Sequence, residues 1–552
     1  MPIPPKPSGN LAGLLARHAY LAIALIALWV AAAGTSQLPL NGHEVYVAET
    51  AREMQERGDW LIPHFNGQLR LNKPPLNYWL TGAMAWLAGQ QPIEDWHARA
   101  VSVLAATGLA VLTLALGRRL YSDRRVSLLG ALLLVSSLGF FSYSHDARPE
   151  MLYALCCMAG YTALAEARHR QQRNQNSAAA AYAMWLAFAL ATLAKGPHVP
   201  AMLLAGSVGF LHWRERQSWR AIGRLLRPLT GILLAAAIAA PWWWWLRRHI
   251  GADTLSHSQL GGALLKLDWR QILNPYHFIR ILQLLLPWSL LLPLALGLAW
   301  RQRLLSRESL WLLTLIAVSA VILGFGSQRR WFYMLPLLPA LCLPLAEALV
   351  KLADDAGRRR WLANAVTGLW LLVAATSVFL FFRPGCCDEG NWPALLAALA
   401  VAVAWLAALI VRLRRPENGW SGLAGSSLAL AAMLALLGDS PALWGPERFD
   451  VRQALTAVAP HLDADTQIVS LGDSPMACIF YLQRQVTRVD SLEELSETLA
   501  RARRPTLVIV DNGRVAELPA AWRQERLAAM PDGTEEPKTF LLLQPPRPTD
   551  SP

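Results

Sequence analysis

The chain has 552 residues, of which 54% are hydrophobic and 16% are charged, and its formal net charge is +13. The hydrophobic residues form long blocks with almost no charge, which excludes a set of ordinary soluble domains because a soluble core would interrupt such blocks with polar residues. The arginines lie in short connectors between the blocks, where they set membrane orientation, so we do not expect nucleic-acid binding.

The apolar blocks predict an all-α polytopic membrane domain over residues 1–440. Several of them approach or reach the roughly 17–25 residues that a helix needs to cross the hydrocarbon core. These blocks are Ala19–Gly34, Val126–Phe140, Ile232–Trp245, Ile281–Leu298 and Leu362–Phe382. Together with shorter apolar runs, they predict about thirteen transmembrane helices.

The arginine-rich connectors predict the orientation. They are residues 118–125, 168–173, 214–227, 301–307, 351–360 and 412–415, and the positive-inside rule places them in the cytoplasm. Residues 35–97 then form one long periplasmic first loop. Within this loop Leu76–Ala88 is too short to span the bilayer, so we expect a juxtamembrane helix there. The amino terminus is expected inside, and everything after Gly438 in the periplasm.

Residues 441–552 change to short β-rich runs that alternate with helical stretches, which predicts a small periplasmic α/β domain. The expected strands are Gln467–Leu471, Cys478–Leu482, Thr506–Val510 and Phe540–Leu543. Ser491, followed three residues later by Glu494, is typical of a capping box that opens a helix over Leu492–Arg503.

Polar and charged residues gather on the expected periplasmic side. They lie in the first loop, around Asp146–Glu150, in the turn Lys195–Pro197 and in Ser327–Tyr333. Ionisable groups at a membrane edge are costly, so this grouping predicts a functional site on that side. His257, in the loop before His277, is a further candidate for substrate contact, and a solvated loop histidine explains it equally well.

The first loop carries a recognisable motif order. Gly42–Met54 reads GHEVYVAETAREM, and Gly58–Pro63 and the segment Asn72–Leu76 (NKPPL) follow it. This order resembles the first loop of bacterial relatives of the protein O-mannosyltransferases, and among them the 4-amino-4-deoxy-L-arabinose lipid A transferase group, which has the GT-C fold. The resemblance continues through Ala147–Glu150 (ARPE), the Lys195-Gly196-Pro197 turn and the segment that starts at Tyr333 (YMLP), and covers most of residues 19–350.

The resemblance implies a glycosyltransferase that takes a sugar from a polyprenyl (undecaprenyl) phosphate donor and passes it to lipid A, a glycan or a protein. The chain departs from the family in three places. The family commonly has Asp-Glu where this chain has His43-Glu44, an acidic residue in place of Asn72, and Asp at the position aligned with Glu150. Loss of the first Asp weakens the transfer of aminoarabinose specificity to this chain.

The chemistry of such a transfer suggests cations for the phosphate. Breaking the bond at the anomeric carbon leaves a phosphate, so positive charge beside that phosphate matters more than a general acid. Lys73, Lys195, Arg329 and Arg330 are the candidates, and arginine offers the two-pronged contact that phosphate prefers. Tyr333 is a further candidate for substrate binding.

A carboxylate on the acceptor side can orient or deprotonate an attacking hydroxyl. Glu44 is the first candidate for this role and Glu150 the second, with Asp146 as the alternative if the alignment is shifted by one turn. Glu44, Glu150 and His43 are also candidates for holding a divalent metal ion, although their spacing is scattered.

Other interpretations stay open. Asn41 with Glu44 fits a capping box, so Glu44 is alternatively a helix cap. Arg329 and Arg330 could anchor at the bilayer edge, and Tyr333 could belong to an aromatic belt. A multi-pass transporter of an envelope precursor is the rival function. It predicts charged or broken helices near the bilayer midplane and paired halves, whereas this sequence has apolar span centres and no repeat.

Overall fold

The computed structural model describes residues 18–543, except 90–91, 252–253, 256–257, 259–274, 325–329, 382–395, 404, 407–418, 439–443, 445–446, 474–475, 524 and 531–537. The predictions for His257 and Arg329 therefore lie outside the described residues.

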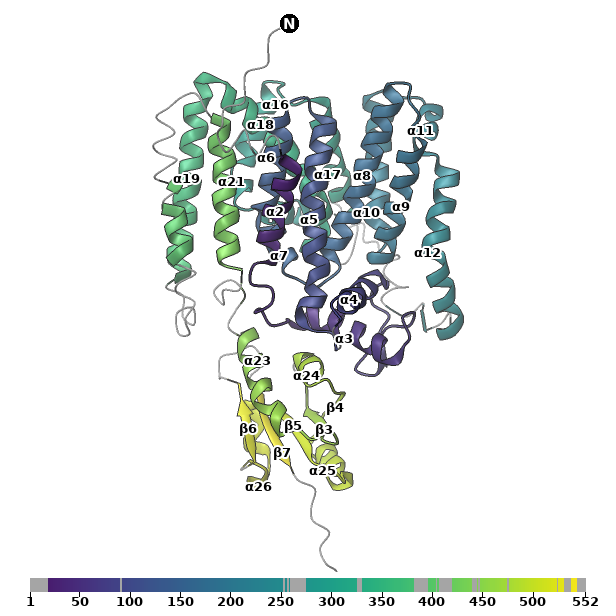
Figure 1. Ribbon diagram of the computed structural model, residues 1–552, viewed down its shortest axis with the longest axis vertical. Helices are drawn as coiled ribbons and strands as arrows, with labels where there is room; N and C mark the ends of the chain where they lie inside the picture. The colour runs from purple at the N-terminus through teal and green to yellow at the C-terminus, as the bar shows by residue number, and fades with distance from the viewer. Residues whose placement is uncertain are drawn as a thin grey trace, which may run out of the picture.

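The membrane region is a bundle of helices that run along the long axis of the molecule (Figure 1). In chain order its helices are α2 (Ala19–Ala32), α5 (Asp95–Leu120), α6 (Arg124–Val135), α7 (Leu138–Ser144), α8 (Glu150–Gln172), α9 (Ala178–Ala194), α10 (His198–Gly209), α11 (Trp219–Leu226), α12 (Pro228–Ile250), α15 (Tyr276–Leu284), α16 (Leu292–Arg301), α17 (Arg307–Gly324), α18 (Leu338–Asp354), α19 (Ala356–Phe381) and α21 (Gly419–Leu436). A continuous apolar core connects them, with Trp288 and Trp311 among its largest buried side chains.

Among the described helices, four are long and apolar enough to cross a membrane, or five if the bent pair of α6 and α7 counts as one span. Four shorter apolar helices accompany them: Ala19–Ala32, Ala178–Ala194, Trp288–Arg301 and Trp420–Leu436. The chain is thus a multi-pass helical membrane protein. The count of about thirteen spans stays a prediction.

Two of the apolar blocks do not form one continuous helix each. The block 126–140 bends by 55° between α6 and α7, where the Ser136 hydroxyl donates to the carbonyl of Leu132 (2.6 Å) and so competes with the helix ladder. The block 281–298 breaks at Pro287, which has no N–H to continue a helix. The two breaks meet, because the Trp288 indole donates to Ser136 Oγ (2.9 Å).

The first loop forms a layer at one end of the bundle (Figure 1). It contains α3 (Gly42–Arg57), a small hairpin of β1 (His64–Phe65) and β2 (Gln68–Leu69), and α4 (Leu76–Leu87). The short helix predicted over 76–88 is therefore present. The Asn41 side chain caps α3, and Gly58, with a φ of 66°, ends it because glycine adopts this left-handed conformation at little cost.

The region after α21 contains a five-stranded sheet in the order β4-β3-β5-β7-β6. Its elements are α23 (Glu447–Val458), β3 (Gln467–Leu471), α24 (Met476–Tyr481), β4 (Val486–Val489), α25 (Leu492–Arg501), β5 (Thr506–Asp511), α26 (Ala520–Arg523), β6 (Arg526–Ala529) and β7 (Lys538–Leu543). Strand β3 pairs in parallel with β4 and β5, and β7 runs antiparallel to β5 and β6. Ser491 Oγ accepts the Glu494 N–H (3.1 Å), which confirms the predicted start of α25, while the Glu494 side chain accepts the N–H of Asp490 (2.9 Å) and the helix ends at Arg501 rather than Arg503.

One predicted strand was wrong. Residues 478–482 lie mostly in helix α24, because a short apolar run does not by itself distinguish a strand from a buried helix. This helix packs its buried Cys478, Ile479 and Phe480 against Val45 of α3 in one apolar cluster. The sheet region therefore lies against the first loop, at the same end of the bundle (Figure 1).

Candidate active site

The centre of the candidate site is an ion pair between two helix ends. Glu150 opens α8, and Lys195 follows the last residue of α9. Gly196, with a φ of +149°, and Pro197 then turn the chain into α10. Lys195 Nζ lies 3.2 Å from Glu150 Oε1, and both side chains are only 3% exposed. The sequence predicted both residues, and the structure brings them together across 45 positions of the chain.

Glu150 keeps one oxygen available. Its Oε2 atom is buried and has no hydrogen-bond partner among the described residues. Leaving a buried carboxylate oxygen without a partner costs roughly 1–3 kcal/mol or more, so a native structure seldom does this without a reason. A hydroxyl group of a substrate would satisfy this atom.

Aromatic rings surround the Lys195 ammonium group. Its Nζ lies 4.3 Å from the ring centroid of Phe332, 5.0 Å from Tyr333 and 5.5 Å from Tyr153. Such cation–π contacts stabilise a desolvated ammonium group. They also leave it able to donate hydrogen bonds to an anion. Tyr333, a predicted substrate-binding residue, therefore lies beside Lys195. Its role in substrate binding stays a prediction.

A second cation shares the Phe332 ring. The Arg148 guanidinium group lies 5.5 Å from the ring centroid of Phe332 and 5.6 Å from that of Tyr143. Its Nε atom donates to Asp146 Oδ2 (2.7 Å) in the same turn. Asp146, the alternative acceptor-side carboxylate, is therefore engaged with Arg148. Positive charge from the end of α9 and from the 146–149 turn lies around one aromatic ring, that of Phe332.

Lys73 and His43 of the first loop face the same charges. Burial lowers the pKa of Lys73, the Glu150 carboxylate opposes this change, and Arg70, Arg330 and Arg148 add to it. Burial, and then Arg148, lower the pKa of His43, so the imidazole is neutral at pH 7. The region therefore collects an excess of cations around Glu150, which suits a phosphate group.

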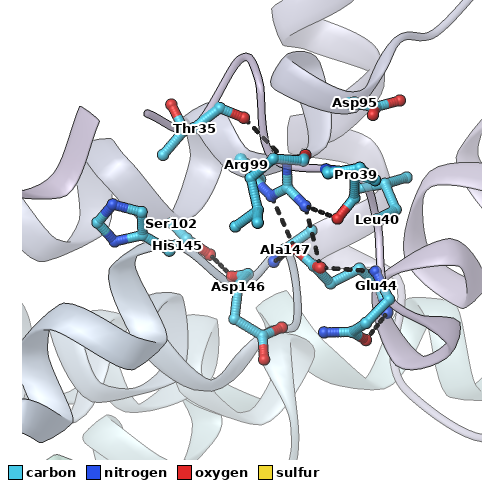
Figure 2. A network of polar contacts seen from close by, with 12 residues as sticks. Thr35, Pro39, Leu40, Glu44, Asp95, Arg99, Ser102, His145, Asp146 and Ala147 are labelled. Atoms are coloured by element: carbon cyan, nitrogen blue, oxygen red, sulfur yellow. Dashed lines mark hydrogen bonds and ion pairs between the residues drawn. The ribbon is translucent and has the colours of Figure 1, made fainter. Parts of the chain in front are cut away.

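Glu44 has a different environment (Figure 2). It is fully buried and pairs with Arg99 of α5, whose Nε atom lies 2.8 Å from Glu44 Oε1. Arg99 also donates to the backbone carbonyls of Thr35 and Pro39, both at 2.9 Å. The carboxylate of Glu44 further accepts the N–H of Asn41 (2.9 Å) and of Ala147 (3.0 Å). The capping box that the sequence allowed is thus present.

These contacts give Glu44 a structural role in connecting the first loop to the 146–149 turn. Arg99 and one backbone N–H bind each of its oxygens. The contact with Ala147 holds the residue that lies between Asp146 and Arg148. Glu44 therefore ties the first loop to the turn that carries the site cations. Its catalytic role stays a prediction.

The predicted metal ligands Glu44, Glu150 and His43 do not form a ligand set. Across the described ranges, no group of three or more His, Cys, Asp or Glu side chains is arranged to hold a metal ion. Both oxygens of Glu44 already bind Arg99, which a cation at that place would displace. As they are arranged, these three side chains do not fit a single metal ion. A requirement for a divalent metal stays a prediction.

The sequence did not single out several neighbours of the site. Arg148 lies inside the quoted Ala-Arg-Pro-Glu motif, so its position was visible but its role was not. Tyr153 follows Glu150 by three residues, about one helical turn, and its hydroxyl donates to the carbonyl of Gly196 (2.9 Å). No local signal marks Arg99 or Phe332, whose partners are distant in the sequence. Arg330 is exposed and precedes the 3₁₀ helix Trp331–Leu337.

Comparisons with known proteins agree with this architecture. A family model described as dolichyl-phosphate-mannose-protein mannosyltransferase matches residues 37–253. The undecaprenyl phosphate-alpha-4-amino-4-deoxy-L-arabinose arabinosyl transferase of Erwinia tasmaniensis is 28% identical, and the match spans 62% of this chain and 61% of that protein. The corresponding enzyme of Aeromonas hydrophila is 27% identical over 73% of this chain and 74% of that protein.

Solved structures show the same fold. The crystal structure of ArnT from Cupriavidus metallidurans in the apo state has a TM-score of 0.76 and 17% identity, and covers 96% of this chain and 98% of that chain. A second structure of that protein, bound to undecaprenyl phosphate, also has a TM-score of 0.76.

The similarities in sequence and in fold support a membrane glycosyltransferase of the GT-C type. Within that class, the chain is similar to the protein O-mannosyltransferases over residues 37–253 and to the bacterial aminoarabinose transferases. This finding favours an enzyme over the transporter that the sequence left as a rival.

Proposed function

We propose that the chain transfers a sugar from an undecaprenyl phosphate donor to an acceptor in the bacterial envelope. The curated relatives are named for an undecaprenyl phosphate-linked aminoarabinose, and one solved neighbour is bound to undecaprenyl phosphate. The observation that carries the proposal is the buried Lys195–Glu150 pair, with Arg148 on the same aromatic ring. This is a cation-rich, largely desolvated site of the kind that a lipid phosphate requires.

The proposed reaction uses these charges in one displacement. An acceptor oxygen forms a bond to the anomeric carbon, while the bond from that carbon to the phosphate oxygen breaks. The phosphate departs on the polyprenol with one more negative charge than it had in the donor. Lys73, Lys195 and Arg330 stabilise the increase, because preorganised cations act most strongly where charge develops. Arg329 and His257 stay additional candidates for substrate binding.

The carboxylates serve the acceptor or the sugar. If the acceptor is a hydroxyl of a glycan or protein, its proton passes to Glu150, whose Oε2 lacks a partner among the described residues. If the acceptor is a phosphate of lipid A, no base is needed, and Glu150 orients Lys195 and the sugar hydroxyls. Lipid A is the first acceptor to test because the relatives are aminoarabinose transferases. The family commonly has Asp where this chain has His43. This difference argues against assigning the aminoarabinose of the relatives to this chain.

The proposal includes a topology. Residues 1–440 form the membrane domain with about thirteen spans, and residues 441–552 a periplasmic α/β domain. The amino terminus is cytoplasmic, and the site faces the periplasm across the inner membrane. Support comes from the common end of the bundle that the first loop and the sheet region occupy (Figure 1). Leu193, two residues before Lys195, packs in one apolar cluster with Leu71 of the first loop.

A deletion strain tests the function. Mass spectrometry should show that lipid A, or another envelope glycan, loses one sugar substituent in the deletion strain. The full-length gene should restore this substituent, and a Lys195→Ala version, expressed at the same level, should restore it poorly. An unchanged lipid and glycan profile in the deletion strain would contradict the proposal.

A further inference from the structure

A cavity lies at the other end of the bundle, away from the candidate active site. It has a volume of about 580 Å³ and lies between α2, α5 and α8. It is lined by Tyr20, Leu112, Ala115, Arg118, Arg119, Ala159, Thr162, Ala163, Glu166 and Arg170. The arginines belong to the last turns of α5 and α8, whose first residues lie beside the first loop (Figure 1).

The charges in this cavity do not balance. Glu166 is the acidic residue of the lining, and it pairs with both Arg119 (2.5 Å) and Arg170 (2.6 Å). Arg118 has no carboxylate partner within the described part of the chain. Its guanidinium group lies 4.4 Å from the ring centroid of Tyr20. The lining therefore has an excess of positive charge.

Three buried polar atoms of the lining also have no hydrogen-bond partner among the described residues: Arg118 Nε, Thr162 Oγ1 and Glu166 Oε2. Of these, Glu166 Oε2 lies in the ion pair with Arg119, so Arg118 Nε and Thr162 Oγ1 are the two that a ligand would satisfy. The lining also contains the apolar side chains of Leu112, Ala115, Ala159 and Ala163, which we call its apolar wall. A ligand that matches this cavity has an anionic, hydrogen-bond-accepting head and an apolar tail.

We propose that this cavity binds the head group of an anionic phospholipid in the leaflet opposite to the donor site. The phosphate would contact Arg118 and Arg170, and an acyl chain would lie along the apolar wall. Basic cavities between helices at the cytoplasmic membrane surface bind anionic lipid head groups through these interactions. A free phosphate ion would match the arginines and leave the apolar wall uncovered. The site is independent of the proposed transfer reaction.

Native mass spectrometry of the full-length protein in detergent tests the proposal, with phosphatidylglycerol and phosphatidylcholine as probes. The wild type should retain phosphatidylglycerol in preference to phosphatidylcholine. The double variant Arg118→Gln/Arg170→Gln should bind phosphatidylglycerol at least about tenfold more weakly, since each basic contact at a lipid surface contributes about a fivefold factor. Arg224→Gln/Arg301→Gln is the matched control, because these arginines also lie in last turns of helices but outside the cavity.

A second variant and a competitor complete the test. Ala163→Leu keeps every charge and fills the cavity, so it should also weaken phosphatidylglycerol binding. Millimolar inorganic phosphate should leave the bound lipid in place. The proposal is overturned if Arg118→Gln/Arg170→Gln retains phosphatidylglycerol like the wild type, if phosphatidylcholine binds equally well, or if inorganic phosphate displaces the lipid.

Discussion

The substitution Glu44→Gln separates a structural from a catalytic role for the first acidic residue of the first loop. In the wild type, Glu44 and Arg99 are both fully buried and joined by two contacts, of 2.8 and 3.1 Å. Glutamine keeps the size of the side chain but removes its charge. Arg99 would then be a buried cation with only carbonyl partners, and breaking such a pair costs roughly 3–5 kcal/mol. This is a large fraction of the stability of an ordinary domain.

The contacts of Glu44 also predict which measurement changes. Glutamine can accept only through Oε1, so the N–H groups of Asn41 and Ala147 cannot both keep their present partner. We therefore expect Glu44→Gln to lower the thermal unfolding temperature in detergent and to lower transfer through the displaced 146–149 turn. The double variant Glu44→Gln/Arg99→Met should recover part of the lost stability, because it leaves no unpaired charge.

Thermal unfolding and transfer activity, measured on the same preparations, check this reasoning. A Glu44→Gln protein that unfolds at the wild-type temperature but transfers no sugar would refute the structural role. That result would instead support Glu44 as the carboxylate that acts on the acceptor, the role that the sequence predicted.

The remaining predictions concern the phosphate, the carboxylate, pH and topology. Lys195→Ala and Lys73→Ala should each weaken binding of undecaprenyl phosphate by about 10- to 150-fold, the equivalent of a charged hydrogen bond of roughly 1.5–3 kcal/mol, as measured by equilibrium binding. Glu150→Gln should lower the transfer rate by about a hundredfold or more if the acceptor is a hydroxyl, and far less if it is a phosphate; single-turnover assays with each acceptor class distinguish the two. Because burial lowers the pKa of Lys73, donor binding should fall as alkaline pH rises through that lowered pKa, and Lys73→Arg should shift the fall to higher pH in a binding titration. A reporter fused after Gly438 should be active in the periplasm and one at Arg170 in the cytoplasm; the opposite result would overturn the proposed topology.

The sequence by itself determined the elements whose causes are local. Uncharged blocks of sufficient length specify membrane helices, since a helix satisfies its backbone hydrogen bonds within the segment. Short β-rich runs between helical stretches predicted strands β3, β5 and β7 nearly at their observed bounds. Asn41 and Ser491 marked the starts of α3 and α25, because a cap acts within one turn of its own residue. The motif order also indicated the family.

Only the tertiary structure decided which of these residues meet. Glu44 and Arg99 are 55 positions apart, and nothing near either one marks the other as its partner. The helical form of residues 476–481 depends on packing against α3, which the local apolar run does not encode. Lys195 and Glu150 were both visible as charged residues at membrane edges. Their pairing on the Phe332 side of the bundle follows from how α8 and α9 pack, because long-range contacts are set by the whole fold and not by the segment that contributes each residue.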